Sequence, residues 1–412
     1  MRDKLTALEK KWILYDVANS AFTMMVSTII PIFFNQLSKQ AGISEVDYLA
    51  YWGYTISLTT VIVALLGPVL GAAADRGGRK RRVFAITIIL GAIGCAALGF
   101  AGNWFIFLGV FCIVRVLYSL SLVIYDSTLV DVTTEDRMDN VSSQGYAWGY
   151  IGSCVPFIAC LLLVLFAEQI GISQMKALTV SMIVTALWWG GVSIPLLKSY
   201  WQKNFIEEEQ QTGILKQLRT SLKDLVQDKK ILLFLLAFFF YIDGVYTIID
   251  MSTAYGTALG LNTTDMLLAL LVTQFVAFPC ALLYGRLAQK GWSGRLILVA
   301  IAAYTGIAIF AIFMNAAWQF WILAVVVGMF QGGIQSLSRS YFTKIIPAER
   351  SGEFFGFYDI CGKGASFIGT TVMSLVSQLT GVANYGVGVI AVFFVIGLVL
   401  FIMSTRVSDK TR

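Results

Sequence analysis

The most constraining feature of the chain is a nearly unbroken series of apolar stretches, each long enough to cross a membrane. A hydrocarbon core ~30 Å thick needs about 20 apolar residues per helix. Such stretches recur along almost all of the 412 residues. Only 13% of the residues are charged, whereas a soluble domain carries about 25%. The sequence therefore predicts an all-α membrane protein.

Polar residues between the stretches predict twelve transmembrane helices, over 12–37, 52–74, 82–101, 103–127, 142–167, 176–197, 230–256, 264–288, 294–314, 317–340, 353–378 and 383–404. Six helices fall in 1–197 and six in 230–412, which we expect to form two six-helix bundles. The segment 198–229 between them is polar. Its apolar residues recur at helical spacing, with Lys216, Arg219 and Lys223 among them. This pattern predicts an amphipathic helix on the inner membrane face, or a linker packed on the bundle.

The distribution of Lys and Arg predicts the orientation, because basic residues favour cytoplasmic loops. With the N-terminus inside, the outer connections contain only Lys39 and Lys176. We therefore expect a multi-pass protein of the cell membrane with both termini in the cytoplasm. The net charge of +6 is explained by this topology and needs no nucleic-acid partner.

The residues for metal or enzyme chemistry are sparse. The sequence has no histidine, and its six cysteines lie in apolar stretches without a CxxC pair. No metal site, cofactor, catalytic residue or nucleophile–base pair is expected.

Four of the predicted helices carry polar stripes. A charge at the bilayer centre costs about 2.5–3.5 kcal/mol, so such residues should face protein or water. The stripes consist of Asp16, Asn19, Ser20, Thr23 and Ser27; Arg115, Tyr118, Ser119, Tyr125 and Asp126; Asp243, Tyr246, Thr247 and Asp250; and Gln331, Gln335 and Arg339. They occupy helices 1, 4, 7 and 10, which predicts a central water-filled path. Hydrogen bonding between helices is the alternative, and is favoured for the serines and threonines.

Depth separates two roles among these residues. Arg115 lies roughly 17 Å and Asp243 roughly 20 Å into their helices, near the midplane. We expect Arg115 to bind a carboxylate or phosphate, and Asp243 to bind an amino group or carry a coupling proton. The other candidates for substrate binding are Tyr118, Asn19, Thr23, Tyr246, Gln331 and Gln335, and those for proton coupling are Asp16 and Asp250.

A weak internal repeat supports the two-bundle layout. A shift of 213 residues aligns 133–137 with 346–350 and Asp126 with Arg339. Asp126, Arg339 and Asp16 are expected within a turn or two of the cytoplasmic surface, where they would form a gate. On helix 11, Asp359 and Lys363 are spaced to neutralise each other.

Residues 71–81, GAAADRGGRKR, resemble the signature loop of the major facilitator superfamily. The resemblance implies a cytoplasmic gating role for Asp75 and Arg76. An aspartate here is suited to the N-terminus of a neighbouring helix, whose dipole favours an anion.

Four further stretches, YDVANSAF from residue 15, VSSQGYAWGY from 141, QSLSRS from 335 and EFFGFY from 353, resemble the vacuole-effluxer-like facilitators. Val17 stands where tryptophan is usual, which leaves aromatic contacts in helix 1 open. Fungal members are linked to export of amino acids from the vacuole. From the predicted architecture and this resemblance together we expect a monomeric secondary transporter working by alternating access, with an amino acid or small organic anion as substrate and carboxylates as the carriers of any coupled proton. A multidrug or lipid exporter, or a membrane receptor that does not transport, is the alternative; an enzyme is not expected.

Overall fold

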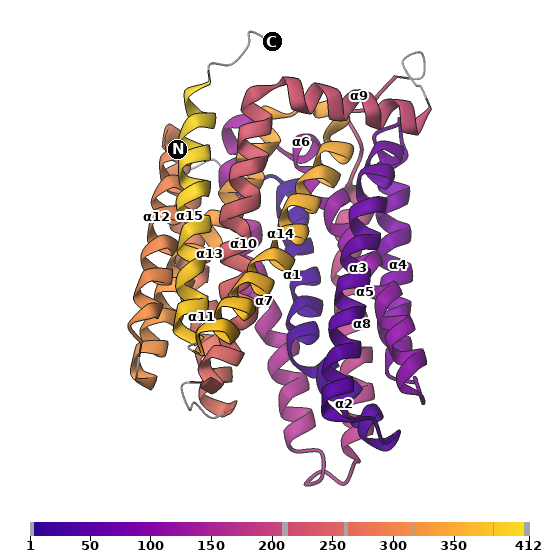
Figure 1. The fold of residues 1–412 in the computed structure, drawn as a ribbon. Helices are drawn as coiled ribbons and strands as arrows, with labels where there is room; N and C mark the ends of the chain where they lie inside the picture. The colour runs from indigo at the N-terminus through magenta and orange to yellow at the C-terminus, as the bar shows by residue number, and fades with distance from the viewer. Residues whose placement is uncertain (1–3, 208–212, 259–262, 315, 382, 408–412) are drawn as a thin grey trace.

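The computed structural model describes residues 4–207, 213–258, 263–314, 316–381 and 383–407. Its long helices are α1 (Ala7–Ser27), α2 (Ile29–Gln40), α3 (Glu45–Ala74), α4 (Lys80–Leu98), α5 (Trp104–Ser127), α7 (Met138–Leu165), α8 (Gln174–Ser199), α9 (Ile214–Gln227), α10 (Lys229–Ala258), α11 (Thr263–Leu287), α12 (Ser293–Ile312), α13 (Ala317–Ile345), α14 (Ser351–Thr380) and α15 (Ala383–Arg406) (Figure 1). Short helical turns are α6 (Leu129–Val132), η1 (Glu135–Arg137), η3 (Ala288–Trp292) and η4 (Ala348–Arg350). In the described chain, ten segments are helices long and apolar enough to cross a membrane. The predicted all-helical membrane class is confirmed.

The first predicted helix, 12–37, is wrong at its start. α1 begins at Ala7, where Thr6 and Glu9 form a capping box. The charges at Glu9, Lys10 and Lys11 hid this beginning, because they interrupt the apolar pattern. Asp16 consequently lies ~14 Å inside α1, deeper than the turn or two expected from the sequence.

The same predicted helix is interrupted in its second half. α1 ends at Ser27 and α2 begins at Ile29, with Thr28 in a non-helical conformation. Pro31 explains the break, because its ring clashes with the carbonyl four residues earlier, that of Ser27, and it lacks an N–H. Proline is tolerated in the first turn of a helix, which is where α2 places it.

Apolar side chains form two large buried clusters. One is drawn from residues 12–200, and the other almost wholly from residues 225–401. The helices that carry the two clusters meet along α3 with α14, along α7 with α11, and where α13 crosses α7. The water-filled path expected between the two clusters would therefore be bordered by the α3–α14 contact on one side and the contacts of α7 with α11 and α13 on the other.

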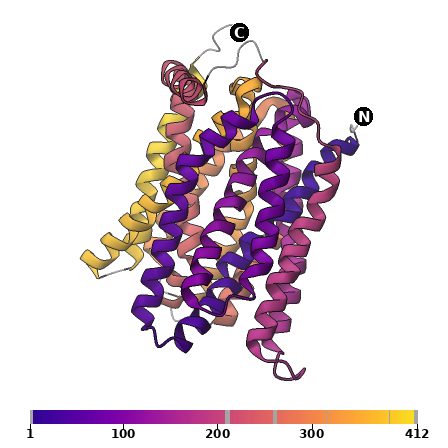
Figure 2. The same cartoon turned by 90° about the vertical axis from the view of Figure 1, so that its right-hand side faces the viewer.

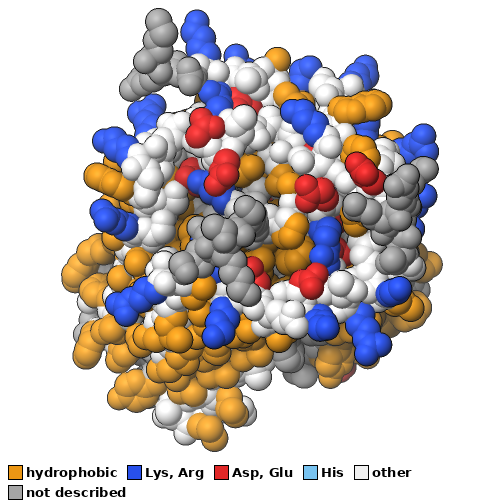
Figure 3. All heavy atoms as spheres, turned by 90° about the horizontal axis from the view of Figure 1, so that it is seen from above, with side chains coloured by type: hydrophobic (Ala, Val, Ile, Leu, Met, Phe, Trp, Pro, Cys, Tyr) orange, Lys and Arg blue, Asp and Glu red, His pale blue; other side chains and the backbone are white. Residues whose placement is uncertain are grey.

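Both ends of the described chain lie at the same end of the helix bundle. The start of α1, the end of α15 and α6 lie there, and α9 crosses it (Figures 1 and 2). We call it the α9 end. Figure 3 views it directly: Lys and Arg side chains surround the rim, and acidic side chains lie nearer the centre.

Candidate functional site

Arg339 on α13 lies at the centre of a polar cluster at the α9 end. Its Nη2 lies 3.1 Å from Asp16 Oδ2 on α1, and its Nη1 lies 3.0 Å from Asp126 Oδ1 on α5. Its Nε donates to Ser142 Oγ on α7 at 2.9 Å, and Nη2 also donates to the Ser142 carbonyl at 3.0 Å. We name these four residues the Arg339 cluster. The structure thus joins the three residues that the sequence assigned to a gate.

Aromatic rings surround the Arg339 guanidinium. Its Cζ lies 4.4 Å from the ring centre of Tyr146, 4.7 Å from that of Trp12 and 5.5 Å from that of Tyr125. Arg339 is only 2% exposed. A buried cation is stable when carboxylates and hydrogen bonds satisfy it, and ring faces add cation–π attraction. The cluster is therefore a satisfied charge site that closes the space between α13 and helices α1, α5 and α7.

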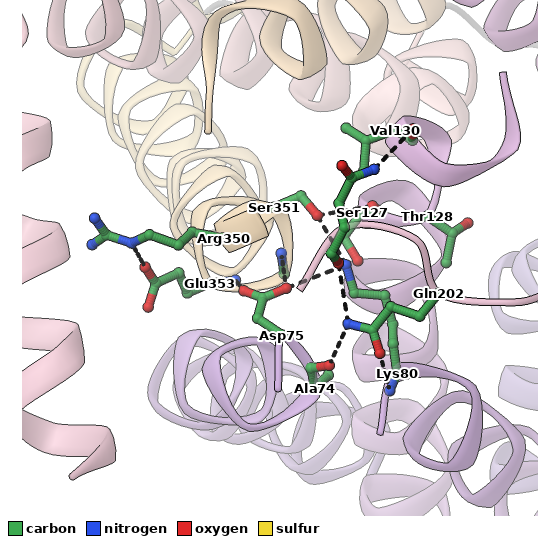
Figure 4. A network of polar contacts seen from close by, with 12 residues as sticks. Ala74, Asp75, Lys80, Ser127, Thr128, Val130, Gln202, Arg350, Ser351 and Glu353 are labelled. Carbon is green, nitrogen blue, oxygen red and sulfur yellow. Dashed lines mark hydrogen bonds and ion pairs between the residues drawn. The ribbon is translucent and has the colours of Figure 1, made fainter. Parts of the chain in front are cut away.

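Asp75, at the end of α3, binds the N-terminus of α14, as its position in the loop predicts. Its two oxygens accept hydrogen bonds from the backbone N–H groups of Gly352 at 2.8 Å and Glu353 at 2.9 Å. Lys80 Nζ lies 3.2 Å from Asp75 and donates to Ser351 Oγ at 2.9 Å (Figure 4). The free N–H groups of a helix start and its dipole both favour this carboxylate.

The helices beside Asp75 touch through backbone. A methyl group added at Gly71 would lie 2.1 Å from the Gly352 carbonyl oxygen, and one added at Gly356 would lie 2.5 Å from Pro68 Cα. Only glycine permits this approach of α3 to α14. The contact is therefore sensitive to a single added carbon.

Arg76 follows Asp75 in the same loop. Its backbone forms an isolated bridge with Ile206, whose N–H donates to the Asp75 carbonyl at 2.9 Å. The Arg76 side chain is half-buried. The segment after α8 thus holds this loop in place. Asp131 in turn holds the segment after α8, because it accepts hydrogen bonds from Tyr200, Lys203 and Asn204.

Asp139, at the start of α7, forms a further polar contact between helices. Unlike the contacts of Arg339 and Asp75, it was not predicted from the sequence. Asp139 accepts hydrogen bonds from Ser340 at 2.6 Å and from Ser293 at 2.5 Å, and pairs with Lys344 at 2.6 Å. The signal available was only its place in the first turn of a helix, where anions are favoured. Its partners lie more than 150 positions later in the sequence.

A chain of hydrogen bonds leads from the interior of α1 to the Arg339 cluster. Thr23 is exposed although it lies ~24 Å inside α1, and its hydroxyl lies 2.5 Å from that of Tyr118. Tyr118 donates to Asn19 Oδ1 at 3.4 Å, and Asn19 Nδ2 donates to Asp16 Oδ1 at 3.3 Å. Three predicted substrate-binding residues are thereby linked to the predicted gate.

The other predicted site residues are placed as follows. Asp243 is fully buried; its Oδ1 accepts from the Gly369 N–H at 3.1 Å and from Thr247 at 3.2 Å, and its Oδ2 meets no hydrogen-bond partner in the part of the chain that the structure describes. The hydrogen bonds of Asp243 therefore do not involve Arg115. Arg115 and Tyr246 are half-buried, Gln331 and Gln335 are buried, and the side chain of Asp250 lies outside the described residues. The predicted Asp359–Lys363 ion pair is confirmed, at 2.6 Å.

No group of three or more cysteine, aspartate and glutamate residues in the described ranges is placed to hold a metal ion. What the site offers is charge pairs between helices, the exposed hydroxyl of Thr23 on α1, and the Tyr118 hydroxyl and buried Asn19 amide linked to it. Such groups bind and release solutes and hold helices together.

Comparisons with known proteins agree with this architecture. The sequence model of the vacuole effluxer Atg22-like family matches residues 9–138 and 130–411. The MFS-type transporter YxiO of Bacillus subtilis is 42% identical over 407 residues, which cover 97% of this chain and 95% of that protein. Autophagy-related protein 22-1 of Aspergillus niger is 23% identical over 64% of this chain, and the match covers 46% of the fungal protein.

Solved structures show the fold. The E. coli fucose:proton symporter FucP superposes with a TM-score of 0.73 at 15% identity, over 97% of this chain and 98% of that one. The human organic anion transporter MFSD10 gives 0.67 at 13% identity, over 96% and 98%. YxiO and the proteins of these two structures are named as transporters, not as enzymes. The chain belongs to the vacuole effluxer Atg22-like family and is a secondary transporter with the major facilitator fold.

Proposed function

We propose that the protein moves a small zwitterion or organic anion, with amino acids the favoured class, by alternating access of two six-helix halves. The halves are 1–197 and 230–412, joined by the linker 198–229. Two observations support twelve spans rather than the ten apolar segments described above. The segment Leu268–Ile312 is one of the ten but contains two helices, α11 and α12. α14, which is not among the ten, is 30 residues long. The protein acts as a monomer in the cell membrane.

In this proposal the α9 end faces the cytoplasm, since Lys and Arg surround it. Both termini are then cytoplasmic. The Arg339 cluster, Asp75 with Lys80, and Asp139 with Lys344 close the cytoplasmic end, so the conformation is the one open to the opposite side. Opening requires these contacts to separate, which gives Asp16, Asp75, Arg76, Asp126 and Arg339 their gating role.

The observation that carries the proposal is the hydrogen-bond chain from Thr23 to Arg339. A solute that binds the hydroxyl groups of Thr23 and Tyr118 competes with the bond that orients Asn19. Asn19 in turn donates to Asp16, which pairs with Arg339. Binding in the path therefore changes the hydrogen bonds of the gate, as alternating access requires.

Asp243 is proposed as the proton carrier. Among the described residues its buried Oδ2 has no hydrogen-bond partner, and a buried carboxylate without a counter-charge is costly. A proton on that oxygen neutralises the group. Arg115, on α5, is proposed to bind the substrate's anionic group.

The test is transport by protein reconstituted in liposomes. Counterflow of labelled amino acids, chosen by a thermal-shift screen, is expected for the wild type. Arg115→Lys is expected to raise KM at least tenfold, because lysine cannot bind a carboxylate bidentately. Asp243→Asn is expected to keep counterflow and lose accumulation driven by a pH gradient. Glu168→Gln, an exposed carboxylate outside the described helices, is the control and should behave like wild type.

Several results would refute parts of the proposal. Binding without counterflow would favour the receptor alternative, and flux of apolar drugs or lipids alone would favour the exporter. Unchanged accumulation in Asp243→Asn would remove its role in proton coupling.

A further inference from the structure

α9 has three distinct faces around its axis. At 100° per residue, Gln217, Ser221 and Asp224 fall together on one face, and this face meets the bundle. Apolar residues occupy the next third of the circumference: Ile214, Leu215, Leu218, Leu222, Leu225 and Val226. The basic residues Lys216, Arg219 and Lys223 follow on the side away from the bundle.

On the apolar face, three of the six residues are uncovered by protein, while Leu225 is buried against the bundle and the other two are half-buried. Leu215 is 80% exposed, Val226 56% and Leu222 51%. The three basic side chains beside it are also exposed. An apolar face bordered by cations is the arrangement of a helix at a membrane surface, with its apolar residues among acyl chains and its cations at the level of the phosphates.

The bundle face of α9 is fixed by a buried carboxylate. Glu353, at the start of α14, is fully buried and accepts hydrogen bonds from Gln217 at 2.9 Å and from Ser221. Arg350 pairs with Glu353 at 2.5 Å and with Asp224 at 2.8 Å. α9 is therefore held to the first turn of α14 by charged and polar contacts.

The same turn of α14 is the partner of Asp75. The Glu353 N–H donates to Asp75 Oδ2 at 2.9 Å, while the Glu353 side chain holds α9. One residue thus connects α9 with the α3–α14 contact. Displacement of α9 therefore changes the surroundings of Asp75, whose contacts help to close the α9 end.

We propose that Lys216, Arg219 and Lys223 form a binding site for the headgroups of anionic phospholipids, and that lipid binding there stabilises the closed α9 end. The positive charge of the three side chains and the exposed apolar residues beside them identify the bilayer as the partner. Lipid binding requires the membrane fold, and its effect on the α9 end requires the contacts of α9 with Glu353; neither depends on which solute is transported.

The first test measures lipid binding by the full-length protein in detergent. Dioleoylphosphatidylglycerol is expected to raise the thermal unfolding midpoint more than dioleoylphosphatidylcholine. Each cation at an anionic surface contributes roughly fivefold in binding. K216Q/R219Q/K223Q should therefore need at least ~10-fold more of the anionic lipid for half of the shift.

The control is K10Q/K39Q/K176Q, which removes the same charge from exposed positions outside α9 and should retain the wild-type response. Equal responses to the two lipids in the wild type, or equal losses in both triple variants, would overturn the site.

The second test measures the link to the closed end. Spin labels at Arg82 and Arg295, both exposed at the α9 end, report its width in nanodiscs after the native cysteines are replaced. Discs with about 30 mol% of the anionic lipid, which gives them a negative surface potential, are expected to enlarge the short-distance population at least twofold over neutral discs. K216Q/R219Q/K223Q should abolish this change.

Gln217→Leu with Ser221→Ala keeps the basic face but removes the contacts to Glu353. It should bind anionic lipid like wild type in the first test and show no change of distance in the second. A full distance response in this variant would overturn the link through Glu353. Because neither measurement uses a transported solute, failure here is distinguishable from failure of the proposed transport function.

Discussion

Replacing Arg339 by lysine keeps the buried positive charge and removes its planar geometry. The guanidinium uses three nitrogens to make four hydrogen bonds, to Asp16, Asp126 and both oxygens of Ser142. The lysine ammonium has three donors on one nitrogen. At least one of the four bonds is therefore lost, and both carboxylates must be reached from a single point.

The loss can be bounded from these contacts. A hydrogen bond to a charged group contributes about 1.5–3 kcal/mol, and poorer stacking on Tyr146 and Trp12 about 0.5–1 kcal/mol. Arg339→Lys should therefore destabilise the closed α9 end by about 2–4 kcal/mol. The contacts join α13 to α1, α5 and α7, and in the proposed cycle they exist only while that end is closed. The ratio of closed to open molecules should fall roughly 30- to 1,000-fold.

The assay is the rate at which maleimide modifies a cysteine at Ser143, in protein lacking the native cysteines. Ser143 is fully buried and its hydroxyl lies 3.0 Å from that of Ser336 on α13. Modification requires opening, so its rate follows the open population. We expect at least ~10-fold faster modification in Arg339→Lys.

Arg286→Lys, at an exposed position of α11, is the matched control and should leave the rate unchanged. If Arg339→Lys and Arg339→Gln both react within twofold of the parent, the Arg339 cluster does not hold the α9 end closed.

Two further predictions concern the α3–α14 contact and the polar path. Gly71→Val must push α3 and α14 apart by more than ~1 Å, because its Cβ would lie 2.1 Å from the Gly352 carbonyl oxygen; maleimide modification at Ser143 should accelerate, whereas Gly53→Val, in open space on the same helix, should not change it. Thr23→Val and Tyr118→Phe should be coupled by about 0.5–1.5 kcal/mol in a double-mutant cycle of unfolding free energy. Additive effects would contradict the hydrogen bond between their hydroxyls.

The sequence predicted the parts of the structure that depend on local pattern. Apolar length predicted the helical membrane class, and the Asp359–Lys363 pair followed from spacing within one helix. Asp75 was placed at a helix start because its loop and the helix dipole both favour that position. The joining of Asp16, Asp126 and Arg339 was anticipated from the repeat and from the cost of buried charge; their role as a gate stays a prediction.

What the sequence could not supply is pairing over long separations. Asp139 looked like an ordinary residue of a first helical turn, because Ser293, Ser340 and Lys344 come from other helices. The partners of Glu353 on α9 are similarly remote. The start of α1 at Ala7 could have been predicted from the capping box of Thr6 and Glu9. It was missed because charged residues in the first turn interrupt the apolar pattern from which membrane helices are predicted.

The pairing of Arg339 with Asp126 has a geometric consequence. The two residues are 213 positions apart, the offset of the internal repeat. If the halves are related by a two-fold axis along the membrane normal, matching positions are equidistant from that axis. Side chains at matching positions whose atoms approach to 3.0 Å must then lie close to the axis, on its Asp126 side because arginine is the longer of the two. A solute leaving along the axis would encounter this pair directly, and a symmetric ancestor with the same residue at both positions would have placed like charges there.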